Sequence, residues 1–185
     1  MPPPSAQKRR KNSLRLRGYD YSQPGAYFVT IVTYQREILF GEIVNGEMVL
    51  NEIGKIVQTE WERTPQIRRE VDLGAYMIMP NHFHAIVIFN EYATVVGATG
   101  RSPLQRSNQP PHGPAPKSLG ALMAGFKSSV TKRINIFRNT PGAPIWQRNY
   151  YDHIIRNDRE MSRIWDYIET NPMRWAEDRE NPRNW

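Results

Sequence analysis

Two histidines separated by one residue are the part of the sequence best suited to chemistry. His82 and His84 flank Phe83 in an apolar, β-branched run that predicts a strand. Side chains two apart on a strand share a face, so both imidazoles project together and Phe83 projects the other way. Such a pair forms half of a metal site, and two neutral ligands leave the charge of the ion free to polarise a phosphate. Taken alone, the pair also fits two structural histidines, and imidazole suits zinc or manganese better than magnesium.

A pair of tyrosines provides the candidate nucleophile. We expect Tyr150 and Tyr151 to lie where a short strand over 145–147 gives way to a helix. A tyrosine, whose free pKa is about 10, attacks phosphorus once its proton is removed. His153 lies two residues after Tyr151, and residues two apart on a helix do not share a face. A tyrosine pair at the start of a helix is also commonly a packing feature.

Composition limits the classes of protein that fit. The 185 residues suffice for one domain with a core, and the net charge of +7 favours an anionic partner, of which nucleic acid is the commonest. Charge alone does not separate this from a merely basic protein. The absence of cysteine excludes thiolate zinc sites and is compatible with the cytosol. No apolar run is long enough to span a membrane, and the charged N-terminus lacks the apolar stretch of a secretory signal.

The arrangement of predicted elements indicates the fold class. Alternating or β-branched runs predict strands over 27–34, 38–44, 47–50, 71–79 and 82–90, with a hairpin turn at Asn45-Gly46 and a break at Pro80-Asn81. Helical periodicity predicts a helix capped by Asn51, one over 118–137, and one capped by Asp158 that ends at Asn171-Pro172. No regular βαβ alternation appears. The pattern therefore predicts an α+β domain with a mainly antiparallel sheet and packed helices.

The chain ends and one internal stretch differ in composition from the rest. Residues 1–17 form a basic arm with six cations and no acidic residue, which we expect to be flexible. Residues 91–116 are rich in Pro, Gly, Ser, Gln and Asn and predict a disordered loop. The domain is expected over 18–175, followed by a tail over 176–185.

Four blocks of the sequence form a combined pattern. The blocks are Arg17-Gly18-Tyr19-Asp20-Tyr21 leading into 27–33, Met79-Pro80-Asn81-His82-Phe83-His84, Trp146-Gln147-Arg148-Asn149-Tyr150-Tyr151-Asp152-His153, and Tyr167-Ile168-Glu169-Thr170-Asn171-Pro172. Together they resemble the single-tyrosine transposases of the IS200 type, and most closely the subgroup associated with repetitive extragenic palindromes (REP) in bacteria. The similarity runs from about Arg15 to Trp175, and four blocks in the right order are more specific than any one of them.

This resemblance implies a sheet of the ferredoxin-like or RNA-recognition type, the core of the histidine–hydrophobic–histidine nucleases. It implies that His82 and His84 bind a divalent ion, Mg²⁺ or Mn²⁺, and that Tyr151 is the nucleophile, with Tyr150 in the preceding aromatic position. Some relatives place a Gln one helical turn after the tyrosine as a third metal ligand. Here that position is Ile155, which cannot serve, and His153 is the substitute.

The implied activity is cleavage and rejoining of single-stranded DNA at hairpin-flanked sites through a 5′-phosphotyrosine link, by a monomer or homodimer. The basic arm and the basic face of the helix over 118–137 are expected to hold the strand, with contacts from Arg15, Arg17, Lys127, Lys132 and Arg133. Two alternatives remain open: a non-catalytic module that binds single-stranded DNA or RNA, and a histidine metalloenzyme that does not act on DNA.

Overall fold

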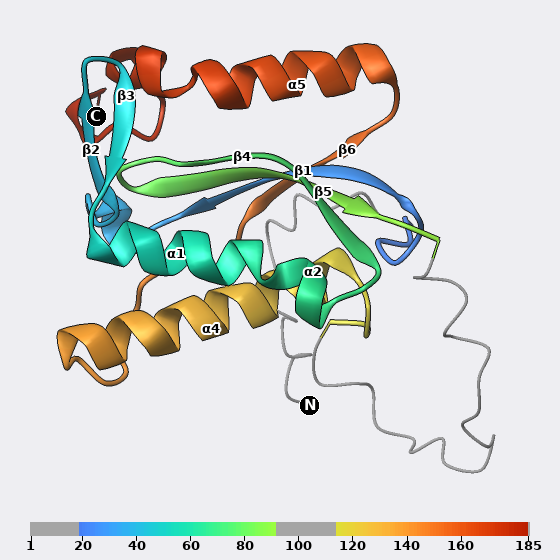
Figure 1. Ribbon diagram of the computed structural model, residues 1–185, viewed down its shortest axis with the longest axis horizontal. Coiled ribbons are helices and arrows are strands. Elements are labelled where there is room, and N and C mark those ends of the chain that lie inside the picture. Colours follow the sequence, from blue (N-terminus) through green and yellow to red (C-terminus); the bar gives the residue numbers. More distant parts are fainter. Residues whose placement is uncertain (1–18, 92–113, 185) are drawn as a thin grey trace, which may run out of the picture.

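A four-stranded antiparallel sheet organises residues 19–91 and 114–184, which are the residues that the computed structural model describes (Figure 1). Its strand order is β4–β5–β1–β6. The strands are β1 (Gly25–Val32), β4 (Val71–Ile78), β5 (His82–Phe89) and β6 (Tyr151–Ile155). The sheet confirms the predicted α+β class with a mainly antiparallel sheet.

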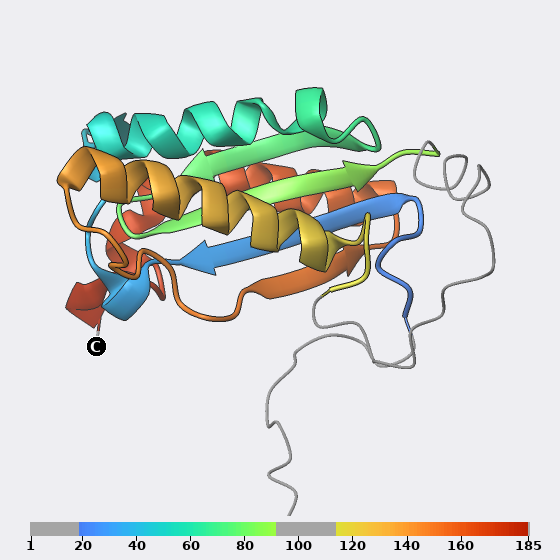
Figure 2. The same cartoon turned by 90° about the horizontal axis from the view of Figure 1, so that it is seen from below.

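Helices cover both faces of this sheet. The helices α1 (Glu52–Glu62) and α4 (Leu119–Arg138) lie together on one face, and α5 (Asp158–Thr170) lies on the other (Figures 1 and 2). The helix α1 lies in the connection from β1 to β4, which passes over β5, and α4 lies in the connection from β5 to β6, which passes over β1. Two such crossovers over one antiparallel sheet define the ferredoxin-like arrangement.

Smaller elements complete one end of the molecule. The hairpin of β2 (Gly41–Val44) and β3 (Glu47–Leu50) turns at Asn45 and Gly46, with φ of 53° and 80° as its turn type requires. Asn51 then caps α1 by accepting hydrogen bonds from the backbone N–H groups of Ile53 and Gly54. The short helices are η1 (Tyr34–Arg36), α2 (Thr64–Ile67), η3 (Pro172–Glu177) and η4 (Pro182–Asn184).

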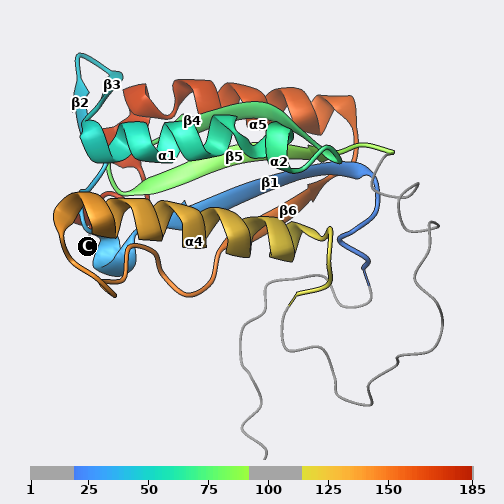
Figure 3. The ribbon, with the colours of Figure 1, turned by 60° about the horizontal axis from the view of Figure 1, so that its bottom comes forward.

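Side chains alternate between the two faces of a strand, so the hydrophobic core forms two layers, one on each face of the sheet. Tyr27, Val29 and Ile31 of β1 pack beneath α1 and α4 in the larger cluster, whereas Phe28 packs beneath α5 with Ile164. Figure 1 shows these layers nearly edge-on, and in Figure 3 the helix α4 lies in front of the sheet and α5 behind it. Because His82 and His84 have the same parity on β5 as Ile86, which packs under α5, both histidines face the α5 side.

Three local predictions near the C-terminal half are wrong. The strand expected over 145–147 is only an isolated bridge between Trp146 and Thr33. Tyr151 begins strand β6 and not a helix, because pairing with β1 extends this segment along the sheet edge. The cap of α5 is Asn157, whose side chain accepts from the Glu160 N–H, and not Asp158.

Other predictions lie outside the described residues. These are the basic arm over 1–17 with Arg15 and Arg17, and the loop over 91–116 apart from residue 91 and residues 114–116. Among the described helices, none has the length and apolar character that crossing a membrane requires.

Candidate metal and nucleophile site

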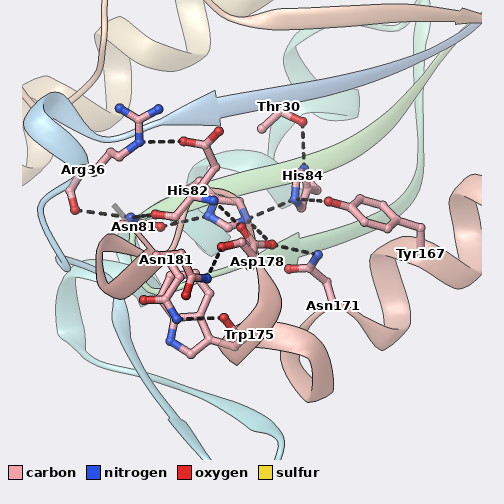
Figure 4. Close-up of polar contacts among 12 residues, drawn as sticks. Thr30, Arg36, Asn81, His82, His84, Tyr167, Asn171, Trp175, Asp178 and Asn181 are labelled. Atoms are coloured by element: carbon pink, nitrogen blue, oxygen red, sulfur yellow. Dashed lines mark hydrogen bonds and ion pairs between the residues drawn. The ribbon is translucent and has the colours of Figure 1, made fainter.

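The two histidines at the start of β5 face one another across a short gap. His82 is fully buried and His84 is 3% exposed, and their Nε2 atoms lie 3.0 Å apart (Figure 4). A break in the sheet at Pro80-Asn81 precedes them, where the Met79 N–H donates to the carbonyl oxygen of His82 and closes the β4–β5 connection. The strand geometry therefore brings the two imidazoles together as the spacing predicted.

Asn81 fixes the orientation and proton of the His82 ring. The Asn81 Nδ2 group donates to the backbone oxygens of Arg36 (3.2 Å) and Glu180 (2.7 Å), so its Oδ1 atom is the acceptor that faces His82 Nδ1 at 2.9 Å. His82 Nδ1 must therefore carry the proton. The Nε2 atom of neutral His82 is left with its lone pair directed at the gap, as a metal ligand requires.

Thr30 plays a similar part for His84. The two residues are opposite one another in the β1–β5 register, and Thr30 Oγ1 lies 2.8 Å from His84 Nδ1. When this hydroxyl accepts the Nδ1 proton, the lone pair of His84 Nε2 also faces the gap. Such outer partners hold a ligating imidazole in one tautomer and one orientation.

Burial keeps both imidazoles neutral. It lowers the pKa of His82 to about 3, against a smaller upward effect of the nearby Asn171 amide. It also lowers the pKa of His84 well below its usual value, with a further downward effect of His82. Neutral imidazoles with free lone pairs are the form that binds metal ions.

Two oxygen donors complete the gap. Asp178 lies on the C-terminal segment, and its Oδ2 atom is 3.9 Å from His82 Nε2. His82, His84 and Asp178 bring ligand atoms within 4.8 Å of one another. Asn171 ends α5; its Nδ2 group donates to Asp178 Oδ2 at 3.2 Å, and its buried Oδ1 atom has no hydrogen-bond partner. A convergence of acceptors with an orphaned oxygen beside them fits a bound cation.

The tyrosine that contacts the histidine pair is Tyr167 of α5. Its hydroxyl lies 3.4 Å from His84 Nε2, and its side chain is 40% exposed. Burial, followed by the negative charge of Asp178, raises its pKa. The hydroxyl therefore points at the histidine pair (Figure 4), while part of the residue remains exposed to solvent.

Tyr151 lies on the same face of the sheet but farther away. Its register partner is Thr30, which in turn pairs with His84, so two strand spacings of about 4.8 Å each separate Tyr151 from His84. The Tyr151 ring contacts Phe28 at 6.2 Å between centroids, and Phe28 stacks on His84 at 5.4 Å. Phe28 thus lies between Tyr151 and the histidine pair.

His153 is also removed from the candidate metal site. Its Nε2 atom lies 2.7 Å from Glu160 Oε1, and its register partner is Phe28, one row of the sheet beyond Thr30. The structure places Asp178 and Asn171, and not His153, beside the histidine pair.

The expected DNA contacts on α4 have different surroundings. The Lys127 ammonium donates to the backbone oxygens of Gln147, Arg148 and Asn149, and burial lowers its pKa to about 8. Arg133 pairs with Glu60 across α1 and α4. Lys132 is exposed and lines an open groove of about 520 Å³ that also includes Lys127 and Arg148. Of these three predicted cations, Lys132 is the one that makes no hydrogen bond or ion pair within the described residues.

Sequence reasoning missed three residues of this site. Tyr167 and Asn171 lie in the fourth family-like block, and their spacing of four residues was a usable signal, since it places an amide one helical turn after a tyrosine. Asp178 carried no such signal, because it lies in the segment expected to be a tail.

Fold and site together define a class: a ferredoxin-like domain with a candidate metal site on one face of its sheet and a tyrosine beside it. A solved structure of a REP-associated tyrosine transposase bound to a REP hairpin has the same fold, with a TM-score of 0.57 and 18% identity over 86% of this chain and 73% of that one. No protein-family model matches the sequence. An uncharacterized protein of Haemophilus influenzae is 37% identical over 169 residues, which cover 91% of each chain. The chain belongs to the same family as that protein.

Proposed function

We propose that this protein is a metal-dependent transesterase that cleaves and rejoins single-stranded DNA at hairpin-flanked sites, with Tyr167 as its nucleophile. The observation that carries the proposal is the contact between the Tyr167 hydroxyl and His84 Nε2, at a buried cluster of acceptors that fits a cation. The shared fold with a transposase that binds a REP hairpin supports the choice of substrate.

The protein groups have separate tasks in this scheme. His82, His84 and the Asn171 Oδ1 atom would hold a divalent ion, Mg²⁺ or Mn²⁺, which would withdraw charge from a phosphate and make it a better electrophile. The Tyr167 oxygen attacks phosphorus, and the bond from phosphorus to the 3′-oxygen of the preceding nucleotide breaks. The phenol proton passes to solvent and the departing 3′-oxygen takes one up, which leaves a 3′-hydroxyl and a 5′-phosphotyrosine ester.

Rejoining is the reverse of this step. Another 3′-hydroxyl attacks the ester and releases Tyr167, so that the number of phosphodiester bonds is conserved and no nucleotide cofactor is consumed. Tyr167 and Tyr151 are 40% and 45% exposed and flank the buried Phe28 ring, so each of the two tyrosines could stack an unpaired base. Tyr151, the nucleophile implied by sequence resemblance, thus has a role in substrate binding in this scheme.

The test is detection of a covalent adduct. The full chain is incubated with Mn²⁺ and a pool of single-stranded DNA hairpins with randomised flanks, labelled at the 3′ end or at the 5′ end, and resolved on a denaturing gel. We expect a protein-linked band with the 3′ label alone and a shortened free strand with the 5′ label. A parallel reaction with chelator should show neither product.

Two results would contradict the proposal. A protein-linked band carrying the 5′ label would mean that the polarity of cleavage is the opposite one. Binding to the pool without any adduct or shortened strand, at all metal concentrations, would favour the non-catalytic binding module.

A further inference from the structure

The C-terminal segment contributes a carboxylate to the candidate metal site. We propose that Asp178 is a direct ligand of the divalent ion, so that the site has two nitrogen donors and a charged oxygen donor. The inference rests on the proposed function only in taking the histidine pair as metal ligands.

The spacing of the donor atoms supports this assignment. An octahedral ion with bonds of about 2.1 Å holds neighbouring ligand atoms about 3 Å apart and opposite ones about 4 Å apart. His82 Nε2 lies 3.0 Å from His84 Nε2 and 3.9 Å from Asp178 Oδ2. The two distances from His82 Nε2 thus approach both spacings, and the ligand atoms of all three residues lie within 4.8 Å of one another.

The chemistry between Asp178 and His82 also calls for a cation. The Asp178 side chain is only 6% exposed, and its Oδ2 atom faces an imidazole nitrogen whose lone pair is directed at it, since Asn81 holds the His82 proton on Nδ1. The ligand atoms of His82, His84 and Asp178 all lie within 4.8 Å of one another, which is a set of acceptors that a bound cation would satisfy. The Oδ1 atom of buried Asn171, which has no hydrogen-bond partner, is a second observation that fits a bound cation.

The segment that carries Asp178 is anchored for such a role. Asp178 Oδ1 accepts the Glu180 N–H at 2.6 Å, which leaves Oδ2 toward the histidines. Glu180 is held by Arg36 Nε at 2.9 Å, and its carbonyl oxygen accepts from Asn81 Nδ2. The same Asn81 therefore orients His82 and anchors the segment of Asp178 (Figure 4).

A carboxylate changes the charge of the site. It lowers the net charge of the ion and its protein ligands by one unit relative to a site with neutral donors alone. Carboxylate and amide oxygens are ligands that Mg²⁺ and Mn²⁺ accept. The Asp178 ligand thus adds a charged oxygen donor to a pair of histidines, which is a donor set that divalent ions bind.

The experiment measures Mn²⁺ binding to the full chain without DNA, by electron paramagnetic resonance titration of free Mn²⁺. We expect Asp178→Ala to weaken binding at least about tenfold, with a smaller effect of Asp178→Asn, which keeps an oxygen donor. The matched control is Glu177→Gln, which removes an exposed charge one residue away and should bind Mn²⁺ like the unaltered chain. Circular dichroism establishes that each variant is folded.

A further variant tests whether Asp178 binds the ion directly or only positions the other ligands. Asp178→Cys places a thiolate at the same position, and we expect it to raise the preference for Cd²⁺ over Mn²⁺ at least about tenfold and to produce a sulfur-to-cadmium absorption band. Unchanged Mn²⁺ affinity in Asp178→Ala would overturn the proposal, and faster DNA cleavage in that variant would mean that the carboxylate occupies the place of the scissile phosphate. Because metal binding is measured without DNA, failure of the transesterase proposal would leave this result interpretable.

Discussion

Tyr167 and Asn171 lie one helical turn apart at the end of α5, and both side chains reach the histidine pair of β5. The resemblance to the single-tyrosine transposases implies the same spacing, since some of those relatives place a Gln one helical turn after the tyrosine. Tyr151 does not fit this spacing, because the corresponding position is Ile155 and the segment is a strand. The spacing matches Tyr167 and Asn171, with Asn in place of Gln.

The first prediction separates the two tyrosines. Tyr167→Phe should reduce adduct formation by several orders of magnitude while it preserves DNA binding, because one hydroxyl is removed with little change in volume. Tyr151→Phe is the matched control and should still form the adduct. The measurement is the denaturing gel with 3′-labelled hairpin DNA, and an adduct that persists in Tyr167→Phe but vanishes in Tyr151→Phe would restore Tyr151 as the nucleophile.

The second prediction concerns the neutral ligands. His82→Ala, His84→Ala and Asn171→Ala should each weaken Mn²⁺ binding by at least about tenfold and stop or slow cleavage, since each removes a donor or leaves its partner unmatched. Calorimetric titration of the folded variants with Mn²⁺ gives the affinities. His153→Ala is the control and should bind Mn²⁺ normally, because His153 contacts Glu160 and not the cluster. If all four variants bound Mn²⁺ with the same affinity, His82 and His84 would be structural residues and not metal ligands.

The third prediction is a pH dependence of the metal-free protein. The folded-state pKa values of His82 and His84 lie below the value of about 6.5 expected for unfolded histidine, so the unfolded chain binds more protons below that pH. The free energy of unfolding should therefore fall as the pH drops from 6.5 to 5, with a slope of up to about 1.4 kcal/mol per pH unit for each histidine.

Urea denaturation in the presence of chelator at several pH values measures this slope. The double variant with His82→Gln and His84→Gln should show a flatter dependence over the same range. An identical slope in the double variant would mean that other groups cause the pH dependence.

The fourth prediction distinguishes two cations of α4. Lys132→Ala should weaken single-stranded DNA binding and change the slope of log affinity against log salt by about 0.7, as loss of one phosphate contact does. Arg133→Ala should instead lower the free energy of unfolding by about 1–3 kcal/mol, because it leaves the buried Glu60 carboxylate with fewer partners. Salt titrations and urea denaturation give the two quantities. Lys55→Ala on α1 serves as the charge-matched control, and an equal salt slope in Lys55→Ala and Lys132→Ala would mean that Lys132 makes no specific phosphate contact.

The sequence by itself determined the class of fold, the hairpin at Asn45-Gly46, the cap at Asn51 and the shared face of His82 and His84. These features depend on local rules: the period of a strand, the φ preference of a turn, and the hydrogen bond of a cap. The tertiary structure decided the rest. Whether 151–155 is a helix or a strand depends on pairing with β1, which is remote in sequence.

Which tyrosine meets the histidines was likewise decided by the packing of α5 across the sheet, and not by distance along the chain. Asp178 lies 94 positions after His84 in the sequence. Its segment is held at the site by the contacts of Glu180 with Arg36 and Asn81, and no pattern in the sequence predicts these contacts. Contacts between residues on different helices and strands produce no periodic pattern in the sequence. They can therefore be identified only in the folded chain.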